Sequence, residues 1–329
     1  NELATQYLEV LAGDISEELL GLGDTTYQHL ANEVDRICHV AALVNHRLAY
    51  QHLFAPNVIG TTEIIRFAIS EKKKAIDFIS TVGIQSLLDK TNGSNEATPL
   101  KESVKLSNRY ASGYATSKWA GEHLLHQANK ELGLTSNILR CDMIMPDQKY
   151  KGQANTEDIV TRLLYSIVTT GLAPKSFYQL NADGSRNDGH YDGVPVDVLS
   201  NAIVGLHLNN ESECKTFNAH NYLKDNVSLD TFVDWIETAG YEIHRIENHS
   251  KWFERMENKL KSLPEEQRQR SMIEIMAAYS RPYPTTLVSP DTSNFTALVR
   301  NINDGKDFES LSETYIHKYL NDMVILGLI

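Results

Sequence analysis

The sequence predicts an α/β fold with a doubly wound parallel sheet, followed by a second, mostly helical part. Through the first half of the chain, short runs of β-branched and apolar residues alternate with longer amphipathic stretches. After residue 146 the amphipathic stretches dominate. Strands that alternate with helices indicate βαβ units, and right-handed crossovers place helices on both faces of a parallel sheet.

Short apolar runs are the expected strands, at residues 7–11, 36–40, 75–80, 136–140 and 216–218. Apolar residues at helical spacing predict helices at residues 25–34, 56–70, 114–132, 158–170, 198–207, 229–239, 252–263, 265–279 and 311–326. Pro56 suits the first turn of its helix, where its missing N–H needs no partner. We place a domain boundary after residue 146, which divides the chain into 1–146 and 147–329. Within the second part, we expect residues 189–222 to return to the sheet.

Composition excludes several classes of protein. The 329 residues carry 43 acidic and 31 basic side chains, a net charge of −12, which argues against a nucleic-acid surface. No stretch approaches the ~18 apolar residues of a membrane span, and the first residues lack a signal-peptide pattern. The three cysteines have no zinc-site spacing, so we predict no metal and a reducing, cytoplasmic location. The basic run at residues 72–74 is interpreted as a solvated helix end.

The clearest chemical signal is the pair Tyr114 and Lys118, on the helix expected at residues 114–132. Positions i and i+4 share one face of a helix, so the phenol and the ammonium can meet. A nearby positive charge favours the phenolate, and we therefore expect Lys118 to lower the pKa of Tyr114. A tyrosine tuned in this way can exchange a proton with a carbonyl oxygen. The alternative is a helix-face pair without a function, because this spacing arises by chance about once in such a chain.

The strand expected at residues 75–80 ends in Ser80 and Thr81. A hydroxyl at the carboxyl end of a parallel strand points into the crevice where such sheets bind ligands. Together with Tyr114 and Lys118, it would make a site that polarises a carbonyl group. This arrangement resembles the extended branch of the short-chain dehydrogenase/reductase superfamily, whose sheet is Rossmann-like.

Further segments narrow the resemblance. Asn57-Val-Ile-Gly-Thr61 is similar to a helix motif of the extended reductases. Six segments then occur in order: Ala-Ala-Leu-Val-Asn-His (41–46), Gly-Tyr-Ala-Thr-Ser-Lys-Trp-Ala-Gly-Glu (113–122), Leu-Arg-Cys-Asp-Met-Ile (139–144), Tyr-Lys-Gly-Gln-Ala-Asn (150–155), Ser-Phe-Tyr (176–178) and His-Tyr-Asp-Gly-Val-Pro-Val (190–196). Together they resemble the terminal thioester reductase domain of carboxylic acid reductases, over essentially the whole chain.

The resemblance implies an NADP-dependent oxidoreductase that reduces an acyl thioester on a phosphopantetheine carrier and releases an aldehyde. An adenylation domain and a carrier domain would be its partners. Thr81, Tyr114 and Lys118 are the implied catalytic triad, in which Tyr114 donates the proton. Residues 1–146 would bind NADP(H), and residues 147–329 the substrate and the phosphopantetheine arm.

Two further groups of residues follow from the resemblance. The implied cofactor contacts are Asp14, Ala41, Ala42, Asn45, Ser80, Lys118 and Cys141. The implied contacts to the arm or the acyl group are Gln153, Asp158, Tyr178 and Tyr191. Asp158 is hypothesised to limit the reaction to one hydride. The alternative is an acidic residue at a helix N-terminus, favoured there by the helix dipole.

The family's first strand, Gly-rich turn and helix, which cradle the pyrophosphate, have no match in this sequence. The matching sequence begins at residues 7–14, and Gly21-Leu-Gly23 is interpreted as a turn. We therefore expect a sheet without its first βαβ unit, and a 329-residue chain that by itself is inactive or poorly folded.

Two alternatives remain open. The chain could be the terminal reductase of a non-ribosomal peptide synthetase or of an aminoadipate-reductase-type enzyme. It could also be a non-catalytic fold that binds a carrier or partner protein. Upstream condensation domains would favour the first alternative, whereas the intact Thr81, Tyr114 and Lys118 argue against the second.

Overall fold

The computed structural model describes residues 6–90, 95–107, 109–206, 213–284 and 290–329. The chain divides into two compact units. Unit 1 comprises Asn1–Asp142, Gly205–Ala219 and Pro290–Phe295, and unit 2 comprises Met143–Val204, His220–Ser289 and Thr296–Ile329. Of the segment 189–222, residues 205–219 therefore lie in unit 1 and the rest in unit 2.

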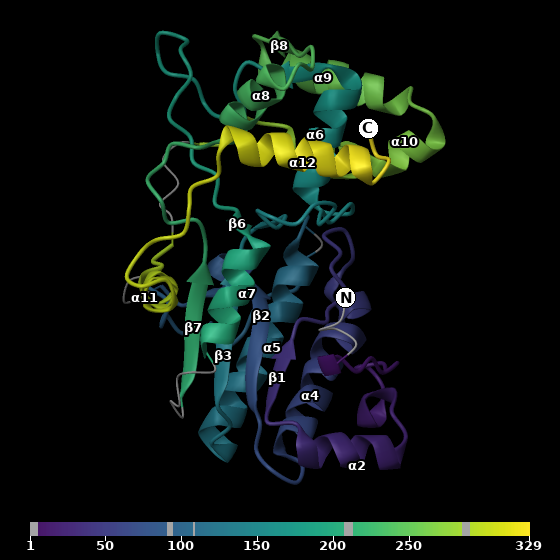
Figure 1. The fold of residues 1–329 in the computed structure, drawn as a ribbon, viewed down its shortest axis with the longest axis vertical. Coiled ribbons are helices and arrows are strands. Elements are labelled where there is room, and N and C mark those ends of the chain that lie inside the picture. The colour runs from purple at the N-terminus through teal and green to yellow at the C-terminus, as the bar shows by residue number, and fades with distance from the viewer. Residues whose placement is uncertain (1–5, 91–94, 108, 207–212, 285–289) are drawn as a thin grey trace. The chain divides into compact units, whose positions relative to one another are not determined.

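Unit 1 is built on a parallel sheet of four strands in the order β1-β2-β3-β7 (Figure 1). The strands are β1 (Arg36–His39), β2 (Ala75–Thr81), β3 (Ser136–Cys141) and β7 (Cys214–Ala219). Their register aligns Thr81 with Cys141 and Cys141 with Ala219, so these residues meet at the carboxyl end of the sheet. The parallel α/β architecture predicted from the sequence is confirmed.

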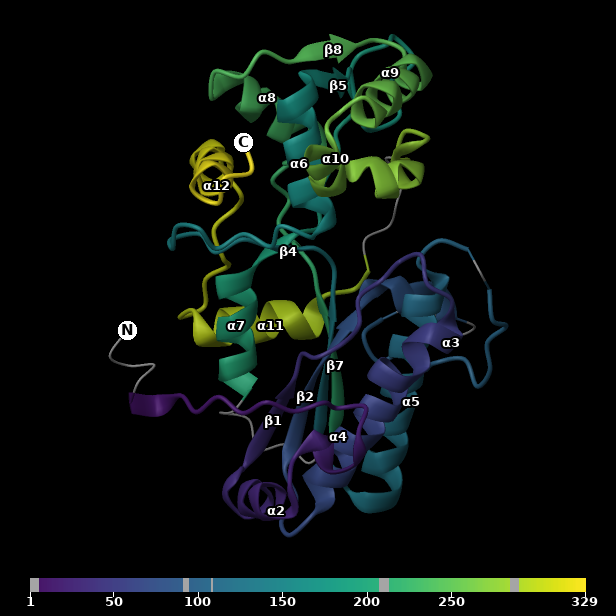
Figure 2. The ribbon, with the colours of Figure 1, turned by 90° about the vertical axis from the view of Figure 1, so that its right-hand side faces the viewer.

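Helices α4 (Gly60–Ile69) and α5 (Ser112–Leu132) pack side by side against one face of this sheet (Figure 2). The core between them is aliphatic and aromatic: Ile64, Ala68, Ile76, Phe78, Leu125, Ala128, Leu134 and Ile138. Other helical segments of this unit are η1 (Glu18–Gly21), α2 (Asp24–Glu33), α3 (Tyr50–Leu53), η2 (Phe54–Ile59) and η3 (Val82–Leu87).

Unit 2 is mostly helical, as predicted. Its core surrounds Trp252, which has no exposed surface and contacts the ring of Phe177 at 5.4 Å. Its helices are α6 (Ile159–Thr170), α8 (Leu229–Thr238), α9 (His249–Lys261), α10 (Glu265–Arg270), η5 (Met272–Tyr279) and α12 (Glu313–Ile325). Two strand pairs, β4 (Ile144–Met145) with β6 (Val194–Pro195) and β5 (Leu172–Pro174) with β8 (His244–Ile246), complete it. Helices α7 (Val196–Gly205) and α11 (Ser293–Ile302) each include residues of both units.

Three predicted elements are wrong or incomplete. Residues 8–11 form no strand, because in the described chain no neighbouring strand accepts their backbone hydrogen bonds. The side chains in this segment are exposed: Tyr7 by 75%, Leu8 by 64% and Val10 by 80%. The helix predicted at 56–70 starts earlier, at Tyr50. Pro56 lies inside the π-helical turn η2, where its missing N–H and its ring widen the helix. The helix predicted at 265–279 is interrupted at Ser271, whose side chain accepts from the N–H of Ile273 and starts a new segment.

Of the lysines at residues 72–74, which the sequence suggests are a solvated helix end, Lys72 is partly exposed and Lys73 is exposed, whereas Lys74 is not. Lys72 donates to the Glu33 carbonyl at the end of α2, Lys73 to the Leu132 carbonyl at the end of α5, and Lys74 to the Ser70 carbonyl after α4. Lys74 is completely buried. Ammonium groups stabilise the unsatisfied carbonyls and the negative dipole ends of helices, so each of these three lysines stabilises a different helix of unit 1.

Candidate active site

The start of α5 is held by close backbone contacts that place Tyr114 and Lys118. Ala111 precedes the helix in a left-handed conformation, with φ of 61°, and its N–H donates to the His46 carbonyl at 2.7 Å. The Ser112 hydroxyl lies within hydrogen-bonding distance of the Ser107 and Arg109 carbonyls. The first turn of α5 is thereby tied to the loop that follows β1.

The tips of β2 and β3 lie under this helix. Thr81 ends β2, and its hydroxyl accepts a hydrogen bond from the Gly83 N–H at 3.1 Å, which caps η3. Gly83 in turn lies against Ala115 of α5. Cys141, the register partner of Thr81, is buried and interacts electrostatically with both Tyr114 and Lys118. The fold therefore brings Thr81, Tyr114, Lys118 and Cys141 to one end of the sheet.

Lys118 is a buried cation, only 3% exposed. Its ammonium donates to the Ile79 carbonyl at 2.8 Å and lies 4.7 Å from the centre of the Phe78 ring. Burial lowers the pKa of Lys118 to about 8, and Cys141 and then Glu122, in their charged forms, oppose this shift. The lysine is therefore poised to titrate near neutral pH.

Tyr114 does not show the lowered pKa that the sequence predicts. Burial raises the pKa of Tyr114 to about 12, because the phenolate would lose its hydration. Its ring meets the His46 imidazole edge-on at 5.5 Å, while Lys118 is hydrogen-bonded to the backbone instead. At neutral pH the phenol consequently keeps its proton, which suits an acid more than a base.

A buried ion pair lies directly behind these residues, and the sequence reasoning missed it. The Glu122 carboxylate accepts from the Ser80 hydroxyl at 2.5 Å and from Arg140 Nη2 at 2.7 Å and Nε at 3.1 Å. Glu122, Arg140 and Ser80 are 0%, 1% and 3% exposed. The available signal was the position of Glu122, one helical turn after Lys118.

The residues expected to contact the cofactor near the N-terminus have local partners. The Asp14 carboxylate accepts from the N–H and hydroxyl of Ser16, and these bonds lower the pKa of Asp14. Asn45 Oδ1 accepts from the N–H groups of Arg47 and Leu48 and so shapes a turn. Ala41 is exposed and Ala42 half-buried, in the loop after β1.

Asn57 joins this loop to α5. Its amide accepts from the Leu43 N–H at 2.7 Å and donates to the Leu43 carbonyl at 3.1 Å and to the Ser117 hydroxyl at 2.9 Å. Ser117 is the neighbour of Lys118. The sequence motif had pointed to residues 57–61, but only the structure reveals the hydrogen bonds of Asn57 to Leu43 and Ser117.

The four residues expected to contact the arm or acyl group lie in unit 2. Gln153 is exposed. Asp158 is the N-cap of α6, where its carboxylate accepts from the Thr161 N–H at 2.7 Å, and burial raises the pKa of Asp158 to about 6. The Tyr178 hydroxyl donates to the His190 carbonyl and accepts from the Leu229 N–H, both within the core. Tyr191 is half-buried and meets the Phe232 ring edge-on at 5.1 Å.

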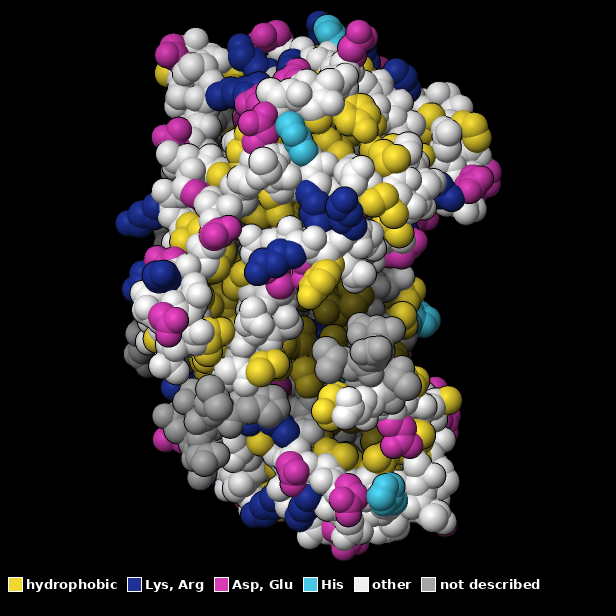
Figure 3. Space-filling view, viewed as in Figure 1, with side chains coloured by type: hydrophobic (Ala, Val, Ile, Leu, Met, Phe, Trp, Pro, Cys, Tyr) yellow, Lys and Arg dark blue, Asp and Glu magenta, His cyan; other side chains and the backbone are white. Residues whose placement is uncertain are grey.

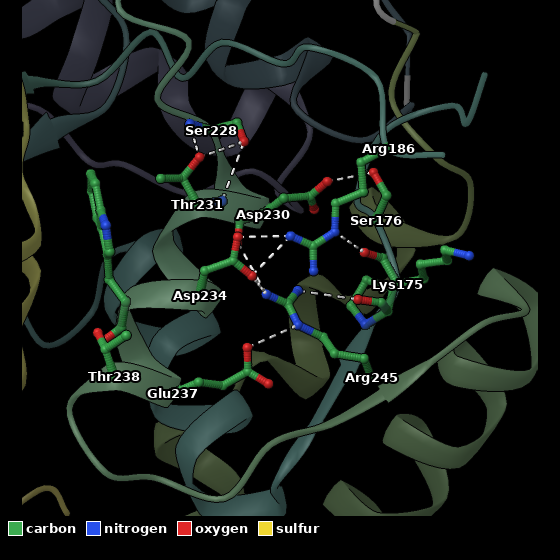
Figure 4. Close-up of polar contacts among 12 residues, drawn as sticks. Lys175, Ser176, Arg186, Ser228, Asp230, Thr231, Asp234, Glu237, Thr238 and Arg245 are labelled. Carbon is green, nitrogen blue, oxygen red and sulfur yellow. Dashed lines mark hydrogen bonds and ion pairs between the residues drawn. The ribbon is translucent and has the colours of Figure 1, made fainter. Parts of the chain in front are cut away.

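Acidic side chains of α8 form a charged cluster with two arginines, and all members of this cluster belong to unit 2 (Figure 4). Arg186 and Arg245 both bind the Asp234 carboxylate, and Arg245 also lies 3.5 Å from Glu237. The Asp230 carboxylate accepts from the Ser176 hydroxyl and the Phe177 N–H. On the face drawn in Figure 3, basic and acidic side chains are intermingled. Arg245 is therefore paired within the fold.

Comparison with known proteins agrees with this geometry. A family model described as Male sterility protein, an NAD-binding domain, matches residues 1–203. The carboxylic acid reductase of Segniliparus rugosus is 42% identical over 100% of this chain, and that of Mycobacterium marinum is 40% identical over 99%. The chain spans 28% of the length of each of these two relatives.

Solved structures give the same result. The reductase (R) domain of a nonribosomal peptide synthetase from Mycobacterium tuberculosis has a TM-score of 0.89 at 35% identity, covering 100% of this chain and 78% of that one. No helix in the described parts of the chain is long and apolar enough to cross a membrane. The chain belongs to the NAD-binding male sterility protein family, and it groups there with the reductase domains of carboxylic acid reductases and peptide synthetases.

Proposed function

We propose that the natural polypeptide containing these residues uses NADPH to reduce an acyl thioester, carried on phosphopantetheine, and releases it as an aldehyde. The observation that supports this proposal is the placement of Thr81 at the end of β2, of Tyr114 and Lys118 in the first turns of α5, and of the Lys118 ammonium against the Ile79 carbonyl of β2. An adenylation domain and a carrier domain would supply the thioester. Unit 1 would hold the cofactor, and unit 2 the arm and the acyl group.

The residues at the sheet end fit a nicotinamide cofactor. Two hydroxyls and a buried ammonium form a donor set suited to a ribose and to a carbonyl oxygen. Val40 and Val44, in the loop after β1, are 61% and 59% exposed and would offer apolar contacts to a planar ring. When bound, NADPH would supply the hydride. Lys118 and the loop at residues 41–45 would hold it, with Asp14, Ser80 and Cys141 as further contacts.

The chain's own residues would then manage charge and protons. Thr81 and Tyr114 would donate hydrogen bonds to the oxygen that becomes negative, and donors organised before the reaction are effective stabilisers. Tyr114, with a pKa of about 12, would donate its proton. The Lys118 ammonium would lower the cost of the phenolate that remains.

Product analysis tests this proposal. The natural polypeptide, incubated with NADPH and an acyl-pantetheine thioester, should consume NADPH and release the aldehyde, identified by mass spectrometry. The free carboxylic acid, offered without activation, is the control and should not react. Binding of a carrier domain without consumption of NADPH would support the non-catalytic alternative. Release of the free acid would make the protein a hydrolase and overturn the proposal.

A peptide synthetase remains the second candidate for the parent protein. The chain is 37% identical, over 100% of its length, to an isonitrile lipopeptide synthase of Mycobacterium tuberculosis. A peptidyl thioester would then replace the simple acyl thioester, with the same chemistry at Thr81, Tyr114 and Lys118. Reduction of peptidyl but not of simple acyl thioesters would favour this candidate.

Asp158 offers a test of product control that separates charge from capping. Serine at this position can still cap α6 but carries no charge, whereas alanine removes both and should cost about 1 kcal/mol of stability. If the charge of Asp158 limits the reaction to one hydride, Asp158→Ser should raise the ratio of alcohol to aldehyde. The ratio is measured by chromatography, with Asp158→Ala as the comparison. An unchanged ratio in Asp158→Ser would assign this residue to helix capping alone.

A further inference from the structure

We infer that Glu122 is a positioning residue for the reaction: its carboxylate ties the ends of β2 and β3 to α5 and provides the negative charge that keeps the buried Lys118 protonated. This inference rests on the proposed function only for its effect on the rate. Its electrostatic part concerns this chain alone.

The geometry places Glu122 at the junction of three elements. Its own helix, α5, carries Tyr114 and Lys118. The Ser80 hydroxyl, bonded to Glu122 at 2.5 Å, belongs to the residue before Thr81 on β2. Arg140, which forks onto Glu122, is the residue before Cys141 on β3 and the register partner of Ser80. One carboxylate thus fixes the spacing between the elements that carry the proposed catalytic groups.

The other groups around Lys118 are neutral at neutral pH. Burial raises the pKa of the Cys141 thiol on β3 to about 12, so it remains protonated. Burial lowers the pKa of His39 on β1 to about 4, with Lys118 itself contributing, so this imidazole is uncharged. Tyr114, at about 12, keeps its phenol proton. The strand β2 offers Lys118 only the Ile79 carbonyl and the Phe78 ring.

Glu122 is therefore the anion that favours the Lys118 ammonium, and its attraction opposes the loss of hydration. Arg140 binds the carboxylate directly and neutralises part of this charge. A purely structural ion pair would also explain the burial of Glu122 and Arg140. The two explanations differ in what removal of the charge does to Lys118.

The experiment measures the pKa of Lys118 from the pH dependence of its acetylation by acetic anhydride. Peptide mass spectrometry of the natural polypeptide follows the reaction, with the exposed Lys149 as internal reference. In Glu122→Gln the pKa of Lys118 should fall below about 8 by about two pH units, the order expected for charges one helical turn, or roughly 6 Å, apart at an effective dielectric constant of ~20. The alkaline decline of the thioester reduction rate should move to lower pH by the same amount. Glu122→Asp, which keeps the charge, should restore both values.

Asp77→Asn is the matched control. Asp77 is also completely buried and bidentate to an arginine, Arg36, but it lies near the other end of β2. Its loss should destabilise the fold without moving the pKa of Lys118. If Glu122→Gln does not fold, Glu122→Gln with Arg140→Met removes a neutral pair instead, and a smaller fall in the pKa is expected.

A folded Glu122 variant with an unchanged Lys118 pKa would overturn the inference and leave a structural ion pair. Failure of the proposed function would look different. The wild-type polypeptide would then not reduce the thioester, while the acetylation data would still report on Glu122 and Lys118.

Discussion

Replacing Tyr114 with phenylalanine should lower kcat for thioester reduction by about 10²–10⁴-fold, the usual contribution of a positioned general acid. The change removes one hydroxyl and keeps the ring that packs edge-on against His46. Because burial raises the pKa of Tyr114 to about 12, the lost group is a protonated donor throughout the neutral range. Stopped-flow measurement of NADPH oxidation in the natural polypeptide, at saturating thioester, gives kcat directly.

Tyr110→Phe is the matched control for this variant. The Tyr110 ring also lies against His46, at 5.7 Å, but its side chain is 41% exposed and precedes α5. Its kcat should stay within a factor of a few of the wild type. Equal losses in both variants would mean that packing around His46, and not the Tyr114 proton, limits the reaction.

Replacing Gly113 with alanine should unfold or strongly destabilise unit 1, by about 3 kcal/mol, the upper range for overpacking. A Cβ at this position would lie 2.3 Å from the Leu48 carbonyl oxygen and 2.8 Å from the Tyr50 nitrogen. Both are backbone atoms, so no side chain can rotate away. The residue also precedes Tyr114, and kcat should fall in whatever fraction folds. Denaturant unfolding of the natural polypeptide, followed through the transition of unit 1, measures the stability change.

Gly23→Ala is the control for the Gly113 variant. It precedes α2 with φ of −71°, and a Cβ there would meet nothing within 4 Å. Its free energy of unfolding should change by less than about 1 kcal/mol. Similar losses at both glycines would show that the close approach of α5 to residues 48–50 does not stabilise the fold.

The sequence was sufficient where a pattern is local. The strands at 36–40, 75–80 and 136–140 were predicted because short runs with apolar and β-branched residues alternate there with longer amphipathic stretches. The placement of Tyr114 and Lys118 one turn apart on α5 followed from helical periodicity, whereas the expected contact between their side chains did not form. Residues 7–11 have a similar apolar run but form no strand, because strand formation depends on a hydrogen-bonding neighbour that the run itself does not encode.

Pro56 and the lysines at 72–74 show the same limit at single residues. The local sequence around Pro56 is compatible with a helix start and with a π-helical turn. Residues 50–53 already form a helix before Pro56, and this places the proline inside a turn. In the sequence, Lys73 and Lys74 are two residues of a basic run. In the structure, their ammonium groups bind carbonyl groups at the ends of α5 and α4, which the run itself does not encode.

By itself, the sequence determined the fold class and the family resemblance, and through that resemblance it led to the proposed triad of Thr81, Tyr114 and Lys118, since short motifs carry each of these. Tertiary structure alone decided how those groups are tuned. The raised pKa of Tyr114 and the lowered pKa of Lys118 come from burial, and burial is a property of the assembled layers. The hydrogen bonds of Glu122 to Ser80 and Arg140 join α5, β2 and β3. These elements are far apart in the sequence, so no local pattern could predict this contact.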